Sequence, residues 1–154
     1  MGGFDETFPR LQDVEFHTEA LLAKPNYSVF SNEESDCFYR IDDRRIETNQ
    51  FDFMKRWARG IELYILKFAH LENAKLLRGT YLSYLKIIYF KGSQNLVSQA
   101  QIEEIMTRLN SKCVDFLFQD KKSQKRLKRY NRGLQKGRFK IKGYNFFYTR
   151  ILCD

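Results

Sequence analysis

Residues 48–90 read TNQFDFMKRWARGIELYILKFAHLENAKLLRGTYLSYLKIIYF, and their pattern indicates the main helical part of the chain. Its apolar side chains recur every three or four residues, the spacing that lines one face of an α-helix. The first half of the stretch contributes Phe51, Met54, Ala58, Ile61, Ile65 and Phe68. The second half contributes Leu77, Tyr81, Tyr84, Leu85, Ile88 and Tyr89. The two patterns run almost in phase, so one helix of roughly forty residues and two shorter helices both fit.

A further helix is expected after residue 98. Ser98 and Gln101 have the spacing of a capping box, in which each side chain binds a backbone N–H group at the start of the helix. The apolar face that follows consists of Ile102, Ile105, Met106, Leu109, Cys113, Phe116 and Leu117. Together with the stretch before it, this pattern predicts a helical core over residues 48–118.

The two ends of the chain carry shorter patterns. A short helix is expected over residues 15–24, ending before Pro25. Two β-prone runs at 26–30 and 37–41 flank the polar loop SNEESD and predict a hairpin, and the alternation over residues 138–148 predicts a second one. The expected fold is therefore α+β and mainly α-helical. It is a single domain (1–154) with about three amphipathic helices over 48–118, small terminal β-hairpins and a basic C-terminal extension.

The charge is distributed unevenly along the 154 residues. The net charge of +8 divides into −6 for residues 1–47, +4 for 48–118 and +10 for 119–154. A strongly basic end favours an anionic partner. The acidic N-terminal segment of the same molecule, or of another copy, is an alternative partner for it.

The basic extension carries the clearest functional signal. Residues 121–136 either extend the preceding helix or form a fourth one, with only Leu127, Tyr130 and Leu134 as its apolar stripe. Cations in such a segment neutralise phosphates, and interleaved aromatic rings stack on unpaired bases. The candidate anion-binding residues are Lys121, Lys122, Lys125, Arg126, Lys128, Arg129, Arg132, Lys136, Arg138, Lys140 and Lys142, and the candidate stacking residues are Tyr130, Phe139 and Tyr144. Anionic lipid head groups attract the same composition, and a basic helix that merely solubilises the protein is the remaining alternative.

Enzymatic motifs are missing from the sequence. There is no phosphate-binding loop, no glycine-rich nucleotide fingerprint and no Gly-x-Ser-x-Gly elbow. Three scattered cysteines and two histidines are too few for a His/Cys metal site. Cys113 lies on an apolar helix face, where burial disfavours a thiolate. We therefore expect no catalytic residue, metal or cofactor.

The compartment is only partly defined by the sequence. The odd number of cysteines suggests reduced thiols in an intracellular compartment, either cytoplasmic or organellar, with the mitochondrion included. The most apolar run, residues 79–90, is interrupted by Lys86 and followed by Lys91, so no transmembrane helix is expected.

These features together suggest a role in an assembly. In composition the chain resembles peripheral ribosomal proteins and accessory subunits of respiratory complexes, although no motif supports the comparison. The leading hypothesis is a non-enzymatic structural or accessory subunit that binds other protein subunits and contacts RNA or anionic lipid through its basic aromatic tail. The alternatives are a free-standing RNA- or DNA-binding protein and a small enzyme of unknown chemistry.

Overall fold

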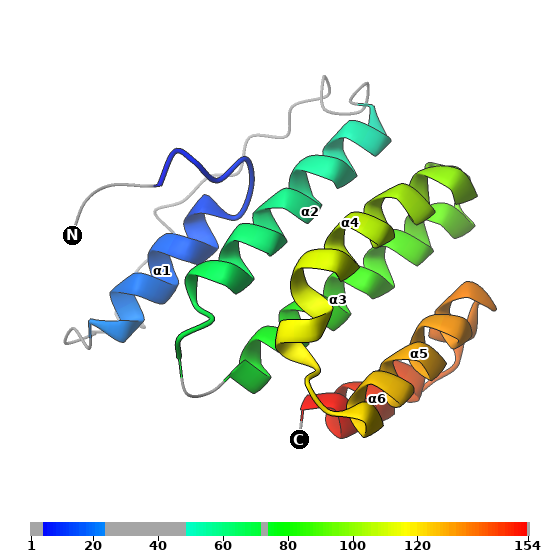
Figure 1. Cartoon of the computed structure of the whole chain (residues 1–154). Helices are drawn as coiled ribbons and strands as arrows, with labels where there is room; N and C mark the ends of the chain where they lie inside the picture. The colour runs from blue at the N-terminus through cyan, green and yellow to red at the C-terminus, as the bar shows by residue number, and fades with distance from the viewer. Residues whose placement is uncertain (1–4, 24–48, 72–73, 154) are drawn as a thin grey trace, which may run out of the picture.

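The computed structural model describes residues 5–23, 49–71 and 74–153, and its regular structure is entirely helical there (Figure 1). The helices are α1 (Gln12–Leu22), α2 (Gln50–Lys67), α3 (Ala74–Ser93), α4 (Gln99–Leu117), α5 (Lys121–Gln135) and α6 (Tyr144–Cys153), and a 3-10 turn at Arg138–Lys140 precedes α6. The α+β prediction is therefore wrong for the described part of the chain, and the expected number of about three helices is too low. The helix predicted over 15–24 corresponds to α1, whereas the hairpin predicted over 26–41 lies outside the described residues.

The helical pattern of residues 48–90 corresponds to two helices, α2 and α3, and not to one long helix. Helix α2 begins after Asn49, whose side chain accepts the backbone N–H of Phe51 at 3.0 Å, and it ends at Lys67. The predicted apolar faces of α2 and α3 are buried except for Phe51, which is half-buried. The periodicity therefore identified the core-facing side of both helices correctly.

Helix α3 is the centre of the molecule. It packs against α2, α4, α5 and α6, and α3 and α4 lie between α2 and the α5–α6 pair (Figure 1). A helix with neighbours on several sides needs apolar side chains around much of its circumference. This explains why Tyr81, Leu82, Tyr84, Leu85 and Ile88 are all buried.

The starts of α4 and α5 are set by side-chain caps. The predicted capping box is confirmed: Ser98 Oγ accepts the Gln101 N–H at 3.3 Å, and Gln101 Oε1 accepts the Ser98 N–H at 2.8 Å. At the next helix start, the Asp120 carboxylate accepts the Ser123 N–H at 2.8 Å. This second cap separates α5 from α4, so the basic segment is a helix of its own and not an extension.

The predicted C-terminal hairpin over residues 138–148 is wrong. Gly137, in the left-handed region at φ 72°, ends α5, and the chain passes through the 3-10 turn into α6. Tyr144, Tyr148 and Leu152 follow at four-residue intervals and pack against the core. A helix brings these three side chains onto one face, whereas an isolated two-stranded hairpin is only marginally stable in water.

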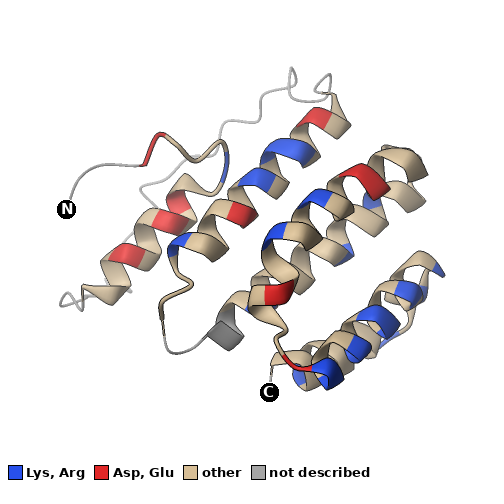
Figure 2. Cartoon of the chain, viewed as in Figure 1, with Lys and Arg blue, Asp and Glu red and all other residues tan. Residues whose placement is uncertain are grey.

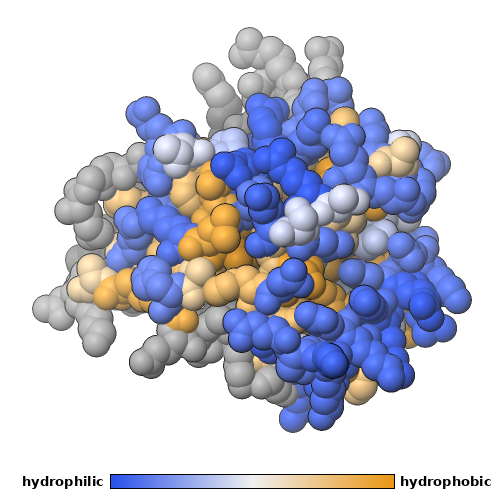
Figure 3. All heavy atoms as spheres, viewed as in Figure 1, coloured by the Kyte–Doolittle hydropathy of each residue, from blue (hydrophilic) through white to orange (hydrophobic). Residues whose placement is uncertain are grey.

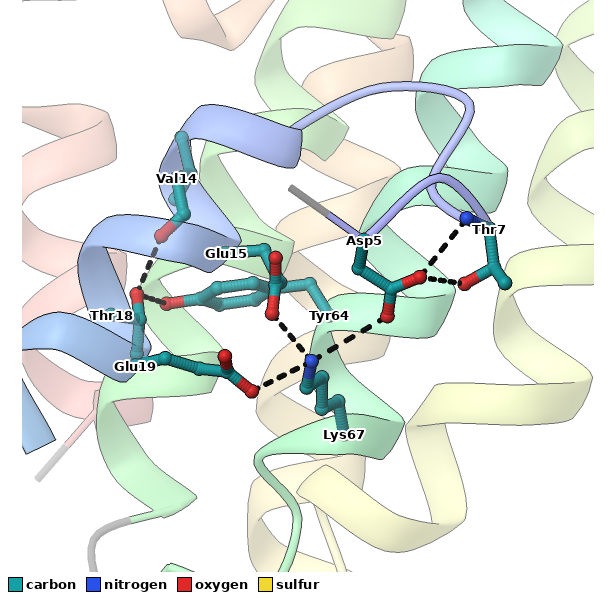
Figure 4. A network of polar contacts seen from close by, with 8 residues as sticks. All are labelled: Asp5, Thr7, Val14, Glu15, Thr18, Glu19, Tyr64 and Lys67. Atoms are coloured by element: carbon teal, nitrogen blue, oxygen red, sulfur yellow. Dashed lines mark hydrogen bonds and ion pairs between the residues drawn. The ribbon is translucent and has the colours of Figure 1, made fainter. Parts of the chain in front are cut away.

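The acidic helix α1 contacts α2 through ion pairs of Lys67 and through a hydrogen bond of 3.0 Å between the Thr18 and Tyr64 hydroxyls (Figure 4). Lys67 Nζ lies 2.5 Å from Glu15 Oε1, 2.8 Å from Glu19 Oε1 and 3.5 Å from Asp5 Oδ2. Only 31% of the Lys67 side chain is exposed. Among the described residues, the acidic N-terminal segment is therefore paired with α2 and not with the basic tail.

Replacing Lys67 by Met should undock α1 without unfolding the core. Glu15 is almost fully buried, and a buried carboxylate without its cation is strongly destabilising, so α1 should detach to rehydrate it. We expect amide-exchange protection of residues 12–22 to fall about tenfold or more, while α3 and α4 keep theirs. The control is Lys86→Met at an exposed site, which should leave the exchange rates of α1 unchanged. Unchanged exchange rates of α1 in Lys67→Met would contradict the docking role of Lys67.

The same contact predicts a pH dependence. Hydrogen bonds to Glu15 and Glu19 raise the pKa of Lys67 above its ordinary value. A raised pKa in the folded state means that the docking contribution is fully present below the unfolded lysine pKa of about 10.4 and is lost only as the pH rises beyond it. Exchange protection of α1 should therefore persist through mildly alkaline pH.

Candidate nucleic-acid interface

The cations of α5 lie on one side of the helix (Figure 2). At 100° per residue, the exposed ones fall within an arc of about 120°. This α5 basic face consists of Lys121, Lys122, Lys125, Lys128, Arg129, Arg132 and Lys136. The face therefore presents one continuous row of positive charge to solvent, and the surface over α5 is strongly hydrophilic (Figure 3).

The orientation of this face follows from the opposite side of the helix. Leu127, Tyr130 and Leu134, the narrow apolar stripe predicted from the sequence, are all buried. Because this stripe packs into the core, the helix cannot rotate its cations inward. The ion pairs between described residues involve cations of α2 and α4 and none of the α5 basic face. The charge of this face is therefore not neutralised by a described carboxylate.

The remaining predicted cations have different surroundings. Arg126 is half-buried and donates from Nη1 to the carbonyl oxygen of Ile151 at 3.0 Å, so it caps the end of α6. Arg138, Lys140 and Lys142 are exposed in and after the 3-10 turn. Arg126 is thus committed to the fold. The side chains of the other three form no hydrogen bond or ion pair with a described residue, and Lys140 Nζ lies 5.9 Å from the ring centre of Phe139.

The three predicted stacking residues are occupied within the protein. Tyr130 is buried, and its ring lies 5.9 Å from that of Tyr144 in a stacked arrangement. Phe139 is half-buried and meets Phe90 edge-on at 6.1 Å. Stacking of a base on Tyr130 would require α5 to leave the core.

Two aromatic residues that the sequence reasoning did not select are far more accessible. Phe146 and Phe147 are 73% and 57% exposed on the outer face of α6, where Arg150 is also exposed. A helical reading of the Tyr144–Tyr148 spacing would have placed them outward. The alternation over these residues suggested a strand instead, so Phe146 and Phe147 were not selected as candidate stacking residues.

A tyrosine cluster joins this aromatic surface to α5. Tyr148 lies 5.1 Å from Tyr130 and 4.9 Å from Tyr144 between ring centroids, and Phe147 meets Tyr148 edge-on at 5.5 Å. Tyr144 Oη donates to the carbonyl oxygen of Tyr130 at 3.3 Å. Burial raises the pKa of Tyr130 and of Tyr144, so both hydroxyls keep their protons at neutral pH.

The close approach of α6 to α5 depends on Gly133. A Cβ atom at this position would stand 1.7 Å from Tyr144 Oη and 2.6 Å from its Cζ. No real side chain tolerates such a contact, so a residue larger than glycine must displace the tyrosine ring.

Replacing Gly133 by Ala should therefore destabilise the α5–α6 pair. We expect the free energy of unfolding to fall by about 1–3 kcal/mol, the usual cost of overpacking, with a changed near-UV circular dichroism of the tyrosines. The matched control is Gly79→Ala, since a Cβ at Gly79 in α3 meets nothing within 4 Å. That control should stabilise the protein by about 0.5–1 kcal/mol because alanine is the better helix former. Equal effects of the two variants would contradict the packing role of Gly133.

Groups typical of an active site are sparse in the described part of the chain. It contains no group of three or more His, Cys, Asp or Glu side chains that could hold a metal ion. Cys113 is buried, and this burial raises the pKa of its thiol to about 12, so the thiol stays protonated at neutral pH. None of the described helices is long and apolar enough to cross a bilayer.

Comparisons with known proteins find no matching protein family, no matching curated protein and no matching solved structure. The function must therefore be argued from the charge and packing of this chain alone.

Proposed function

We propose that this protein is a non-enzymatic accessory subunit of a larger assembly, ribosome-like or respiratory-complex-like, whose α5 basic face contacts RNA. The observation that carries the proposal is the row of seven exposed cations along α5 and at its C-cap, Lys136, none of them in an ion pair with a described carboxylate. Such a row binds a polyanion because each neutralised phosphate releases condensed counterions. At 1.5 Å per residue the helix spans about 22 Å, enough to follow several phosphates of one strand.

Exposed aromatic rings favour RNA with unpaired bases over a uniform polyanion. Phe147 contacts Tyr148, which packs on Tyr130 of α5. The aromatic surface of α6 is therefore connected by direct ring contacts to the helix that bears the cations. Phosphate-binding cations beside accessible rings are typical of proteins that bind single strands.

The apolar surface also supports a role within an assembly. Ile141, Phe146 and Phe147 are each more than half exposed. Exposed apolar groups that form a contiguous surface patch, as Phe146 and Phe147 do on the outer face of α6, are characteristic of surfaces that a partner covers. We infer that other subunits cover part of this surface, and that a free-standing RNA- or DNA-binding protein is the second choice.

One observation favours an anionic membrane surface as a different target. Phe146 and Phe147 share the outer side of α6 with Arg150, and Lys142 precedes the helix. Aromatic rings that enter the head-group region beside cations bind peripherally to anionic bilayers. This candidate uses α6 and not the whole length of α5.

Sedimentation of the native protein from cell lysate, with and without ribonuclease, tests the proposal. We expect it to travel with a large particle that ribonuclease reduces in size. A large particle that resists ribonuclease would reject the RNA contact, and flotation with vesicles containing about 30% phosphatidylserine would then test the membrane alternative. A slowly sedimenting monomer would reject the assembly role.

A further inference from the structure

A small hollow lies where the end of α5 meets α6. It has a volume of about 200 Å³ and is lined by Arg129, Arg132, Gly133, Lys136, Arg138 and Tyr148. Four of these six residues are cationic and none is acidic. Three of the cations belong to the α5 basic face, whereas Arg138 approaches from the 3-10 turn. The hollow therefore gathers positive charge from two elements of the chain.

The hollow owes its shape to the tyrosine packing described above. Gly133 leaves room for the Tyr144 hydroxyl, which lies directly over it, and Tyr148 forms an aromatic wall. Because the tyrosines are held by ring contacts and by the Tyr144–Tyr130 hydrogen bond, the wall exists before any ligand arrives. A preformed site loses less free energy on binding than a flexible array of surface cations.

Size and charge indicate the ligand. Pockets for drug-sized molecules measure roughly 300–1,000 Å³, so this hollow suits a smaller group. Guanidinium groups bind phosphate oxygens through paired hydrogen bonds. A phosphate monoester has about −1.5 to −2 charges and three terminal oxygens at neutral pH, which matches three arginines and a lysine better than the single charge of a backbone phosphodiester.

We propose that this hollow is the seat of a terminal phosphate monoester of an RNA strand whose backbone follows the α5 basic face. The inference rests on the proposed RNA contact and adds a preference for one kind of strand end. The 5′ and the 3′ phosphate share this chemistry, and the hollow accepts whichever end the strand's direction along α5 brings to it.

The test uses the full-length protein and one single-stranded RNA sequence in three forms, with a 5′ phosphate, with a 3′ phosphate and with hydroxyls at both ends. Fluorescence anisotropy measures the Kd of each. We expect one phosphorylated form to bind about tenfold more tightly than the hydroxyl form, the factor that charge-assisted hydrogen bonds supply. The phosphorylated end that gains affinity identifies the direction of the strand.

Two variants that each remove two charges locate the site. The quantity to compare is the Kd of the hydroxyl form divided by the Kd of the phosphorylated form that binds more tightly. In Lys136→Gln/Arg138→Gln this ratio should fall to about one. In Lys121→Gln/Lys122→Gln, at the opposite end of α5, both Kd values should rise while the ratio stays about tenfold. Thermal melting of each variant verifies that it is folded, as expected for substitutions at exposed positions.

Failure of this inference is distinguishable from failure of the proposed function. Equal binding of all three RNAs by the wild type, or a ratio unchanged in Lys136→Gln/Arg138→Gln, would reject the hollow as a phosphate seat but leave the RNA contact intact. No measurable binding of any RNA would reject both.

Discussion

Replacing Lys125, Lys128 and Arg132 by glutamine should weaken binding of the full chain to single-stranded RNA by about 100-fold at ~0.1 M salt. Each phosphate contact on a single strand contributes about 0.7 to the slope of log K against log salt concentration, which corresponds to about fivefold in affinity at this ionic strength. These three cations share the middle of the α5 basic face. The slope should therefore also fall by about 2.

The control must separate the position of the charges from their number. Arg56, Lys86 and Lys112 are exposed on α2, α3 and α4, and the triple change of these residues to glutamine also removes one arginine and two lysines. Affinity and salt slope of this control should stay close to the wild type in anisotropy titrations at several salt concentrations. An equal loss in both triple variants would show that net charge alone attracts RNA and would contradict a specific role of α5.

Arg78→Leu should destabilise the helical core by removing hydrogen bonds to two other helices. Arg78 donates from Nε to the carbonyl oxygen of Leu117 at 2.7 Å and from Nη1 to that of Leu152 at 3.0 Å. The same guanidinium group lies 5.3 Å from the ring centre of Phe118. The side chain thus joins the C-terminal ends of α4 and α6 to α3, where a cation also interacts favourably with the helix dipoles.

We expect this variant to lose about 3 kcal/mol of unfolding free energy, since a hydrogen bond to a charged group contributes about 1.5–3 kcal/mol and water can replace part of it here. For a domain of this size the melting temperature should fall by about 6–12 °C. Urea unfolding and calorimetry measure both quantities. Arg56→Leu, at an exposed site, is the control that should change stability by less than about 0.5 kcal/mol. A similar small change in Arg78→Leu would show that water fully replaces its two contacts.

Local patterns accounted for much of the core. The apolar faces predicted for α3 and α5 are buried throughout, and the predicted faces of α2 and α4 are buried except for the half-buried Phe51 and Phe116. These predictions succeeded because a helix with a long periodic apolar stripe has one way to remove that stripe from water. The capping box at Ser98 is equally local, since its two hydrogen bonds join residues three apart.

Short segments were predicted less well because their periodicity is ambiguous. In residues 144–148 the aromatic residues fit an alternation of period two as well as the four-residue spacing of Tyr144 and Tyr148. Packing against α3 and α5 decided in favour of the helix. This choice turned Phe146 and Phe147 outward and packed the partly buried Tyr144 against Tyr130, which is why the predicted stacking residues differ from the exposed rings.

The helical core, the capped start of α4 and the concentration of positive charge after residue 118 could all be predicted without the structure, because each depends on residues a few positions apart. Three arrangements came only from the packing of the helices: Lys67 holds the acidic helix α1, Arg78 joins three helices, and one hollow beside Tyr148 is lined by Arg129, Arg132, Lys136 and Arg138. These arrangements depend on which helix faces which, and that is set by the packing of whole apolar faces against one another. No local pattern contains that information.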